Sequence, residues 1–444
     1  MANTNSNGAS LKNILKVPEI QKRLLFTFLI LVVVRFGAQI PIPGVSRDVF
    51  ASWFGNQSNG AMDLFDMMTG GSFSQMSVFA LSITPYITSS IIIQLLTIAI
   101  PKLEEMQRDG EDGRKKIASI TRYVTVGLAL IESIAMAIGF GKQGLIKGYA
   151  DMSTIHYVAN IIVVVAALTG GSALLMWIGE RITENGVGNG ISIVLLINII
   201  SGMPNDFATL YSTFVAPKTI AKGVLAGAVI LAILVLMVVL VCFLQDGERR
   251  IPVQYSQKVT GRKSMGGQST HIPLKVNTAG VMPIIFASSL MQFPVIIVQL
   301  FSSTTYEWTK YLSSSYWCKV ATPKYSLGLL LYVVLVIVFA YFYTSITFNP
   351  YEVARNLQKS GATIGGITPG KPTAEYLTRI LNYIIFIGAV GLTIISVIPI
   401  FFSGVFNADV SFGGTSIIII VGVVLETIRQ IEALMVVRKP SRIF

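Results

Sequence analysis

Residues that could support catalysis or bind a metal ion are few in this sequence and lie far apart. Cys242 falls in an apolar run and Cys318 in a loop, so neither indicates a disulfide or a metal site. The two histidines, His156 and His271, are too few for a metal cluster. No stretch matches the motifs of zinc proteases, serine hydrolases or phosphate-binding loops. We therefore expect a protein that is not an enzyme and that holds neither a metal ion nor a cofactor.

The ionisable residues that remain could bind a transported solute. Glu132 is the only acidic residue well inside the first nine apolar runs, and a carboxylate in such a place faces the protein interior by default. Because transporters usually hold a ligand with several charges or with the ends of broken helices, one carboxylate supports that class only weakly. Arg35, near the end of the first apolar run, either extends to the membrane surface or pairs with a neighbour.

The elements that must position these residues are membrane-spanning helices. Apolar residues make up 52% of the 444 residues and charged residues 13%, which is typical of a polytopic membrane protein. The polar, basic start of the chain does not resemble a signal peptide. Because a span needs ~20 apolar residues, we predict an all-α polytopic membrane protein with ten spans. The predicted spans are roughly 24–40, 78–100, 123–140, 158–178, 191–200, 224–244, 281–301, 327–348, 380–402 and 417–437.

Lysine and arginine are unevenly distributed between alternate loops. The N-terminal segment 1–23, the loops after even-numbered spans and the tail 438–444 hold 24 of the 34 basic residues. The loops after odd-numbered spans hold 8. Since basic loops stay on the cytoplasmic side of a membrane, we predict that both termini are cytoplasmic.

Residues 61–101 combine a short amphipathic segment with the second span. The segment carries Asp63 and Asp66 and ends at Gly70-Gly71, before the apolar run. Non-helical backbone at such a joint is tolerated inside a membrane only where it is buried in protein or faces a water-filled cavity. One interpretation is therefore a helix seated in a cavity. The other is an outside loop with an amphipathic helix resting on the membrane surface.

A weak internal repeat relates the two halves of the chain. Five spans lie on each side of an external loop, 204–223, so the halves 24–203 and 224–437 have opposite orientations. The segment that begins at Pro85 in the second span shares a proline, an isoleucine and a serine with the one at Pro283 in the seventh. Inverted repeats place the working site at their interface near the midplane. This arrangement fits either a secondary solute transporter or a channel.

Two cytoplasmic loops, 245–277 and 349–379, are basic and rich in glycine. The rule that basic loops stay inside explains most of these residues one by one. The first loop is nevertheless longer than topology requires, and loops above ~12–15 residues are often functional or disordered. An acidic partner, such as ribosomal RNA or a motor protein, fits the charge. The candidate partner-binding residues are Arg249, Arg250, Arg262, Lys263, Arg355, Lys359 and Lys371.

Seven short motifs, spread over nearly the full length, carry a resemblance to a known family. They are IPIPG at 40–44, SITPYI at 82–87, IIIQLL at 91–96, ITENGVGNGIS at 182–192, QSTHIPLKVN at 268–277, FNP at 348–350 and FGGTS at 412–416. In this order they resemble the SecY family, the central channel subunits of the bacterial Sec protein translocase. The resemblance implies two halves that open like a clamshell around a central pore. It also implies a channel that passes unfolded secretory polypeptides across the bacterial cytoplasmic membrane and releases transmembrane segments sideways into lipid.

The resemblance further implies which residues form the pore. Residues 61–74 correspond to a plug that closes the pore from outside, with Ala61, Met62, Asp63, Leu64, Phe65, Asp66, Met67, Met68, Thr69 and Gly70 as its members. The implied apolar pore ring, which can block ions by dewetting, consists of Ile83, Ile87, Ile191, Leu195, Ile285 and Ile419. A lateral gate between spans 2 and 3 and spans 7 and 8 carries Gln94 and Asn277 at matching polar positions.

The same resemblance implies the partners. They are the small subunits SecE and SecG, signal sequences and nascent polypeptides, and membrane lipid. Since the chain has no nucleotide-binding motif, energy is expected from the ATPase SecA or from a translating ribosome. The family commonly has an arginine where this chain has Thr368, which puts that arginine's role in doubt here, although Lys371 could supply a nearby point charge.

Overall fold

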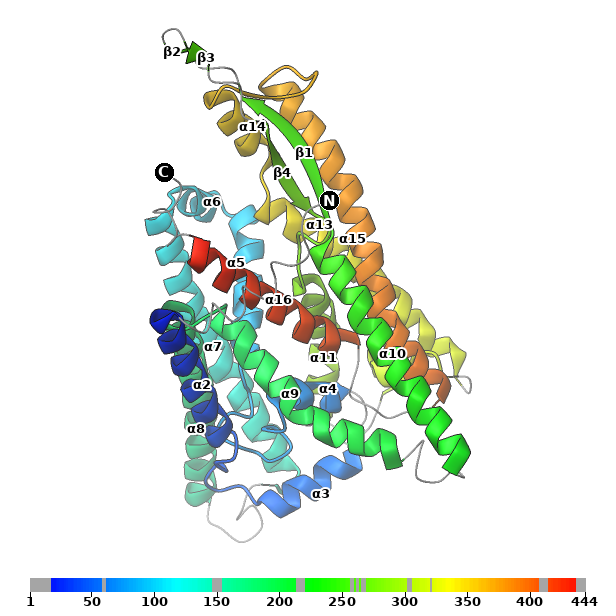
Figure 1. Ribbon diagram of the computed structural model, residues 1–444. Helices are drawn as coiled ribbons and strands as arrows, with labels where there is room; N and C mark the ends of the chain where they lie inside the picture. Colours follow the sequence, from blue (N-terminus) through cyan, green and yellow to red (C-terminus); the bar gives the residue numbers. More distant parts are fainter. Residues whose placement is uncertain are drawn as a thin grey trace.

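The computed structural model describes residues 17–57, 61–145, 154–212, 220–255, 259–260, 263–264, 269–301, 306–319, 322–406 and 414–436. Over these residues the chain is a bundle of helices with two small sheets (Figure 1). Most helices of the first half gather on the left of Figure 1 and most of the second half on the right, with α4 and α16 between them.

The helices cover nearly all of the predicted spans. Those of the first half are α2 (Pro18–Gly37), α3 (Arg47–Gln57), α4 (Ala61–Thr69), α5 (Thr84–Ala99), α6 (Pro101–Arg108), α7 (Glu111–Lys142), α8 (Thr154–Asn185) and α9 (Gly190–Leu210). Those of the second half are α10 (Ile220–Asp246), α11 (Met282–Phe301), α12 (Glu307–Leu312), α13 (Leu327–Thr347), α14 (Pro350–Lys359), α15 (Lys371–Phe406) and α16 (Gly414–Val436). Two 3₁₀ turns, η2 (Ser314–Tyr316) and η3 (Pro323–Ser326), precede α13. Each predicted span overlaps one of these helices.

Six described helical segments are long and apolar enough to cross a membrane. They are Glu111–Lys142, Ile155–Asn185, Gly190–Leu210, Gly227–Asp246, Pro323–Lys359 and Lys371–Phe402. A seventh crossing results if α5 and α6 form one span, although the chain bends by 106° between them. α11 contributes a shorter apolar stretch, Met282–Val298. The described chain is therefore a helical protein with six or seven apolar spans, and the count of ten stays a prediction.

Several helices extend beyond the predicted spans, such as α7, which begins at Glu111, and α15, which begins at Lys371. Two others, α9 and α5, differ in ways that affect the site. α9 runs for 21 residues instead of ending at residue 200, and Pro204 lies within it. Its start is capped because the Asn189 side chain accepts a hydrogen bond from the Ile191 N–H at 3.2 Å. The predicted hinge loop 204–223 thus begins inside a helix. α5 starts only at Thr84, since the preceding residues form turns rather than helix.

A three-stranded antiparallel sheet joins the two long basic loops. The sequence did not predict it. β1 (Glu248–Tyr255) pairs on one side with β4 (Ser269–Lys275) and on the other with β5 (Ala362–Ile364). Two short strands, β2 (Val259–Thr260) and β3 (Lys263–Ser264), pair with each other. Ile251 and Val253 alternate with exposed residues along β1, so they place one face of the strand in an apolar cluster with Leu274. The predicted all-α fold therefore carries an additional small sheet.

Three large apolar clusters fill the bundle. The first-half cluster surrounds Phe50, Phe73 and Phe140, and the second-half cluster lies around α10, α13 and α15. The third, which we name the central cluster, contains residues of both halves, such as Leu195 of α9 and Ile285 of α11. α7 contacts α11, and α9 contacts α16. The two halves therefore meet along the central cluster.

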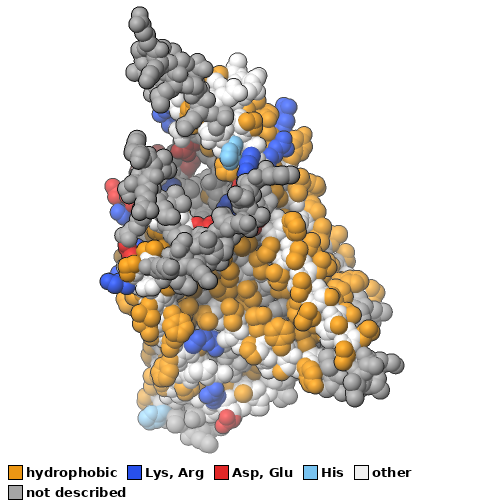
Figure 2. Space-filling view, in the orientation of Figure 1, with side chains coloured by type: hydrophobic (Ala, Val, Ile, Leu, Met, Phe, Trp, Pro, Cys, Tyr) orange, Lys and Arg blue, Asp and Glu red, His pale blue; other side chains and the backbone are white. Residues whose placement is uncertain are grey.

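Apolar side chains also cover much of the outer surface. In Figure 2 they extend over the middle and right flank of the molecule, whereas several lysines and arginines lie near the sheet at the top. On α2, Phe28, Val33 and Phe36 are 63%, 58% and 72% exposed. Exposed apolar surface of this extent marks a face that contacts lipid or another protein.

Candidate functional site

The predicted plug segment consists of α4 and a tightly turned connection to α5. Gly70 follows α4 with a φ of +70°, and its N–H donates to the Met67 carbonyl at 3.1 Å. The N–H of Gly71 donates to the Asp66 carbonyl at 3.0 Å. This pair of bonds is a Schellman motif, in which glycine adopts the left-handed conformation just after a helix. α4 thus ends at the glycine pair that the sequence indicated.

The carboxylate of Asp66 stabilises the turn after α4. Its Oδ1 accepts hydrogen bonds from the Ser74 N–H at 2.7 Å and from the Thr69 hydroxyl at 3.5 Å. The Thr69 hydroxyl oxygen in turn accepts from the Phe73 N–H at 3.2 Å. Burial raises the pKa of Asp66 above its ordinary value, although these bonds partly offset the rise because they favour the charged form. The end of the predicted plug is therefore a locally hydrogen-bonded unit.

The apolar face of α4 packs against both halves of the bundle. α4 contacts α9 and α11, and the described Phe65 and Met67 are buried. Met68 packs against the central cluster. The ring of Phe65 meets the ring of Phe73 edge-on, with centroids 5.1 Å apart, and so connects α4 to the first-half cluster. The side chains of residues 61–64 lie outside the described structure.

Three polar side chains from α2 and α9 contact backbone carbonyls at the end of α4. Nη1 of Arg35 donates to the Gly70 carbonyl at 3.1 Å. The Ser201 hydroxyl is shared between the same oxygen at 3.3 Å and the Asn198 carbonyl of its own helix at 2.7 Å. Nδ2 of Asn198 donates to the Met68 carbonyl at 3.4 Å. Of the two alternatives for Arg35, extension to the membrane surface or pairing with a neighbour, the structure shows pairing, with the Gly70 carbonyl. Asn198 and Ser201 were missed, and the one local signal for them is two polar residues within an apolar run.

The six residues of the predicted pore ring come together in the central cluster. They are Ile83 just before α5, Ile87 on α5, Ile191 and Leu195 on α9, Ile285 on α11 and Ile419 on α16. Five of them are at most 8% exposed, and Ile191 is partly buried against the same cluster. Met68 of α4 packs on this cluster too, so the predicted plug lies next to the predicted ring. That these side chains constrict a pore stays a prediction.

The two polar residues predicted for the lateral gate have different neighbours. Nε2 of Gln94 donates to the Ser90 hydroxyl at 3.3 Å, and its Oε1 is buried with no hydrogen-bond partner among the described residues. Asn277, which is 5% exposed, donates to the Gly280 carbonyl at 3.0 Å in the turn before α11. Among the helices predicted to form the lateral gate, α7 of the first half contacts α11 of the second half.

The basic residues predicted to bind partners lie on the sheet and on the nearby helices. The five whose side chains are described are all exposed: Arg249, Arg250, Arg355, Lys359 and Lys371. Arg250 forms an ion pair with Glu248 on the same strand. Lys263 is placed in β3 without its side chain, and Arg262 lies outside the described residues. Because β5 pairs with β1 and contacts α14, the two basic loops lie at the same end of the molecule (Figure 1).

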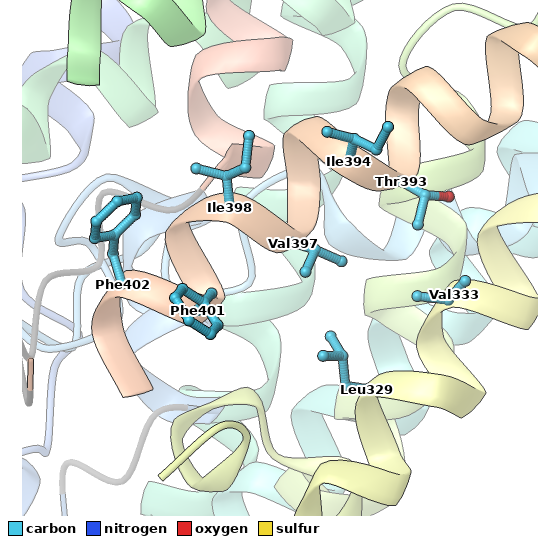
Figure 3. A pocket seen from close by; sticks show the side chains of 8 residues that line it. All are labelled: Leu329, Val333, Thr393, Ile394, Val397, Ile398, Phe401 and Phe402. Carbon is cyan, nitrogen blue, oxygen red and sulfur yellow. The ribbon is translucent and has the colours of Figure 1, made fainter. Parts of the chain in front are cut away.

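An apolar groove of about 440 Å³ lies between α13 and α15 (Figure 3). It is lined by Leu329, Val333, Thr393, Ile394, Val397, Ile398, Phe401 and Phe402. Leu329 and Ile398 pack against the second-half cluster, so the groove is separate from the central cluster. With no charged lining residue and a single hydroxyl, at Thr393, it offers little to hold a polar solute.

Other candidate chemical groups are isolated in the described part of the chain. Within the ranges that the structure describes, no group of three or more His, Cys, Asp or Glu residues could hold a metal ion. Cys242 and Cys318 are free thiols. Glu132 lies on α7, beside Ser133, whose hydroxyl accepts a hydrogen bond from the Thr169 hydroxyl of α8 at 3.0 Å.

Comparison with known proteins adds to this geometry. The sequence profile of the SecY family matches residues 77–428. The protein translocase subunit SecY of Streptomyces coelicolor is 42% identical over 427 residues, which cover 94% of this chain and 95% of that protein. A solved SecY structure, whose plug domain stabilises the closed translocation channel and maintains a membrane seal, aligns with a TM-score of 0.65 and 16% identity over 94% of this chain and 93% of that one. Canine Sec61 in its ribosome–channel complex aligns with a TM-score of 0.61 and 15% identity, with the same coverage. At such identities the two structures establish the fold alone.

Proposed function

The chain belongs to the SecY family, and we propose that it is the pore-forming subunit of a protein translocase in a bacterial cytoplasmic membrane. The 42% identity to a translocase subunit over 94% of the chain supports this function. In this proposal, unfolded secretory polypeptides cross between the two halves of the bundle. Transmembrane segments leave sideways into lipid where the halves part.

The observation that carries the proposal is the position of α4 against the central cluster. Branched apolar side chains hydrate poorly, so a narrow ring of them blocks ions yet can separate around a passing polypeptide. The six ring residues come from four helices and the turn before one of them, and they belong to both halves. Met68 packs on the same cluster. A plug in this position seals the resting pore and is displaced when the halves move apart.

The contacts between the halves support a clamshell of two five-helix units. α7 contacts α11, and α9 contacts α16. Separation of α5 and α7 from α11 and α13 would open a path from the pore to lipid. We propose ten spans with both termini in the cytoplasm, which places the sheet and α14 on the cytoplasmic side and α3 and α12 outside.

The exposed basic residues on β1 and α14 support a cytoplasmic partner that is acidic. A ribosome fits because its RNA is a polyanion, and the Sec61 structure contains a ribosome bound to that channel. We also propose SecA as a motor, and SecE and SecG as accompanying subunits. The carbonyl of Thr368 accepts a hydrogen bond from the Thr373 hydroxyl at 2.8 Å, so position 368 lies in a structured turn before α15. Exposed Lys371 lies three residues further on and can supply charge there.

Deletion of residues 63–69 tests the proposed function. The purified variant, reconstituted in a planar lipid bilayer, should conduct ions at rest, whereas the unmodified protein should not. The expression level and the translocation of a secretory precursor into vesicles show whether the variant is folded. If the variant is folded and translocates but its resting current is unchanged, α4 is not the main seal. Failure of the unmodified protein to translocate any precursor with its partners would overturn the function itself.

A further inference from the structure

We propose that Arg35, Asn198 and Ser201 form a latch that holds the plug in the closed position. This inference rests on the proposed function, because it assigns positioning residues to the proposed seal. The three side chains come from α2 and α9, and their acceptors are carbonyl oxygens at the C-terminal end of α4. They therefore act on the plug through its backbone and not through its side chains.

The latch fits the electrostatics of a helix end. The last carbonyls of a helix lack N–H donors within it and carry a partial negative charge. The Schellman bonds after α4 use the carbonyls of Asp66 and Met67, which leaves those of Met68 and Gly70 for other donors. The guanidinium of Arg35 supplies a positive charge and a donor at this point. A charged donor strengthens a hydrogen bond, and a low-dielectric surrounding strengthens it further.

Gly70 shows how closely the plug approaches the latch. A Cβ atom at this position would lie 2.7 Å from Nη1 of Arg35 and 2.9 Å from Cα of Asn198. The φ of +70° disfavours any larger residue as well. Only glycine therefore allows the end of α4 to lie directly on α9 while its carbonyl faces Arg35.

Asn198 extends the latch to the second predicted span. Its Nδ2 donates to the Ser82 hydroxyl oxygen at 3.1 Å in addition to the Met68 carbonyl. Ser82 has a φ of +51° in the turn just before α5. One amide thus joins the end of the plug to the start of α5. Because α2, α5 and α9 all belong to the first half, these contacts hold the end of α4 on that half.

Arg35→Gln tests the latch directly. Loss of a hydrogen bond to a charged group typically shifts an equilibrium by roughly ten- to hundred-fold, so we expect the resting ion current in a planar bilayer to rise by about ten-fold or more. Arg35→Lys keeps the charge and one donor and should restore most of the seal. Arg47→Gln is the matched control, because the exposed Arg47 donates its hydrogen bond to the half-buried Gln75 side chain at 2.7 Å. That control should leave the current unchanged.

The plug deletion separates the latch from a general structural role. In a protein that lacks residues 63–69, Arg35→Gln should add nothing to the leak, because the two changes then act on one element. An additive leak would show that Arg35 acts elsewhere and would overturn the latch. If folded Arg35→Gln shows an unchanged current while the deletion leaks, the latch is overturned but the assignment of α4 as the plug stands. If Arg35→Gln does not fold, the double variant Asn198→Ala with Ser201→Ala should show the same leak, and a tight membrane would then contradict the proposal.

Discussion

The hydroxyl of Ser416, at the start of α16, donates a hydrogen bond to the sulfur of Met67 on α4 at 3.0 Å. The two residues lie in opposite halves of the chain, and Ser416 is fully buried. The predicted plug therefore contacts the first half through Arg35 and α9 and the second half through α16. Because one element contacts both halves, their separation must break its contacts on at least one side.

Ser416→Ala should weaken the plug's contact with the second half. Thioether sulfur is a weak acceptor, and an ordinary hydrogen bond contributes about 0.5–1.5 kcal/mol. We therefore expect a rise of only a few-fold in resting ion current, smaller than that from Arg35→Gln. Ser345→Ala is a suitable control, since the Ser345 hydroxyl is exposed and donates to a carbonyl of its own helix. A current equal to that of the unmodified protein would show that the bond does not help to hold the plug.

Ile87→Asn combined with Ile285→Asn should wet the central cluster. Each buried isoleucine contributes ~1–3 kcal/mol, enough to shift a gate by one or two decades without unfolding the bundle. We expect a resting ion leak at near-normal expression, with less dependence on a strongly apolar signal sequence. Ile131→Asn with Leu290→Asn is the control pair. These residues also lie on one helix of each half, α7 and α11, but their side chains are 64% and 55% exposed. That pair should insert poorly and not leak, and the same result for the central pair would place those isoleucines against lipid.

The predicted orientation can be tested with two tags. A tag after residue 262 should be labelled by a membrane-impermeant reagent only from the cytoplasmic side. A tag near residue 316 should be labelled only from outside. The reason is the distribution of 24 and 8 basic residues between the two sets of loops. Labelling of both tags from one side would contradict the ten-span topology.

Acidic pH should loosen the segment around Glu307. Its carboxylate accepts a hydrogen bond from Lys324 at 3.1 Å, and this bond lowers the pKa of Glu307. Because the pKa is lower in the folded state, the pair stabilises the segment above the unfolded pKa and loses that contribution as the pH falls through the folded pKa. The effect should be small because the pair is exposed. The protection factors of the α12 amides, which correct for the intrinsic pH dependence of hydrogen exchange, should fall at acidic pH. Glu307→Gln should remove this dependence, while Glu375→Gln on α15 should not.

Arg355→Glu with Lys359→Glu should weaken ribosome binding without affecting membrane insertion. Both residues are exposed on α14, which contacts β5, the strand that pairs with basic β1. The slope of log affinity against log salt concentration falls by ~0.9 for each lost phosphate contact to a duplex. We therefore expect a shallower salt dependence and an affinity that is lower by about ten-fold or more at low salt. Cosedimentation with ribosomes over a salt series measures both quantities. Lys319→Glu is the control, because Lys319 lies on the opposite predicted side of the membrane. If the α14 variant bound ribosomes as well as the Lys319→Glu variant does, Arg355 and Lys359 would have a role in topology alone.

Local pattern was sufficient for the long apolar helices of this protein. The apolar runs predicted where helices lie, since each helix satisfies its own backbone hydrogen bonds and needs only a continuous apolar stretch to enter a membrane. Gly70 and Gly71 indicated the end of α4, because a left-handed residue after a helix is a local requirement. The ordered motifs were sufficient to identify the SecY family. All of these features depend on neighbours within a few residues or on a linear order.

Contacts between distant residues needed the tertiary structure. The sheet was not predicted, because β1 pairs with β5 more than 100 residues away and short strands in basic loops have no apolar run to mark them. The partner of Arg35 is a backbone carbonyl that carries no sequence signal. The six ring residues were proposed from a resemblance, and only the packing of α5, α9, α11 and α16 places them in one cluster. The sequence determined which segments are helical and apolar, whereas their packing decided which side chains meet, because burial rewards any apolar contact and does not specify the partner.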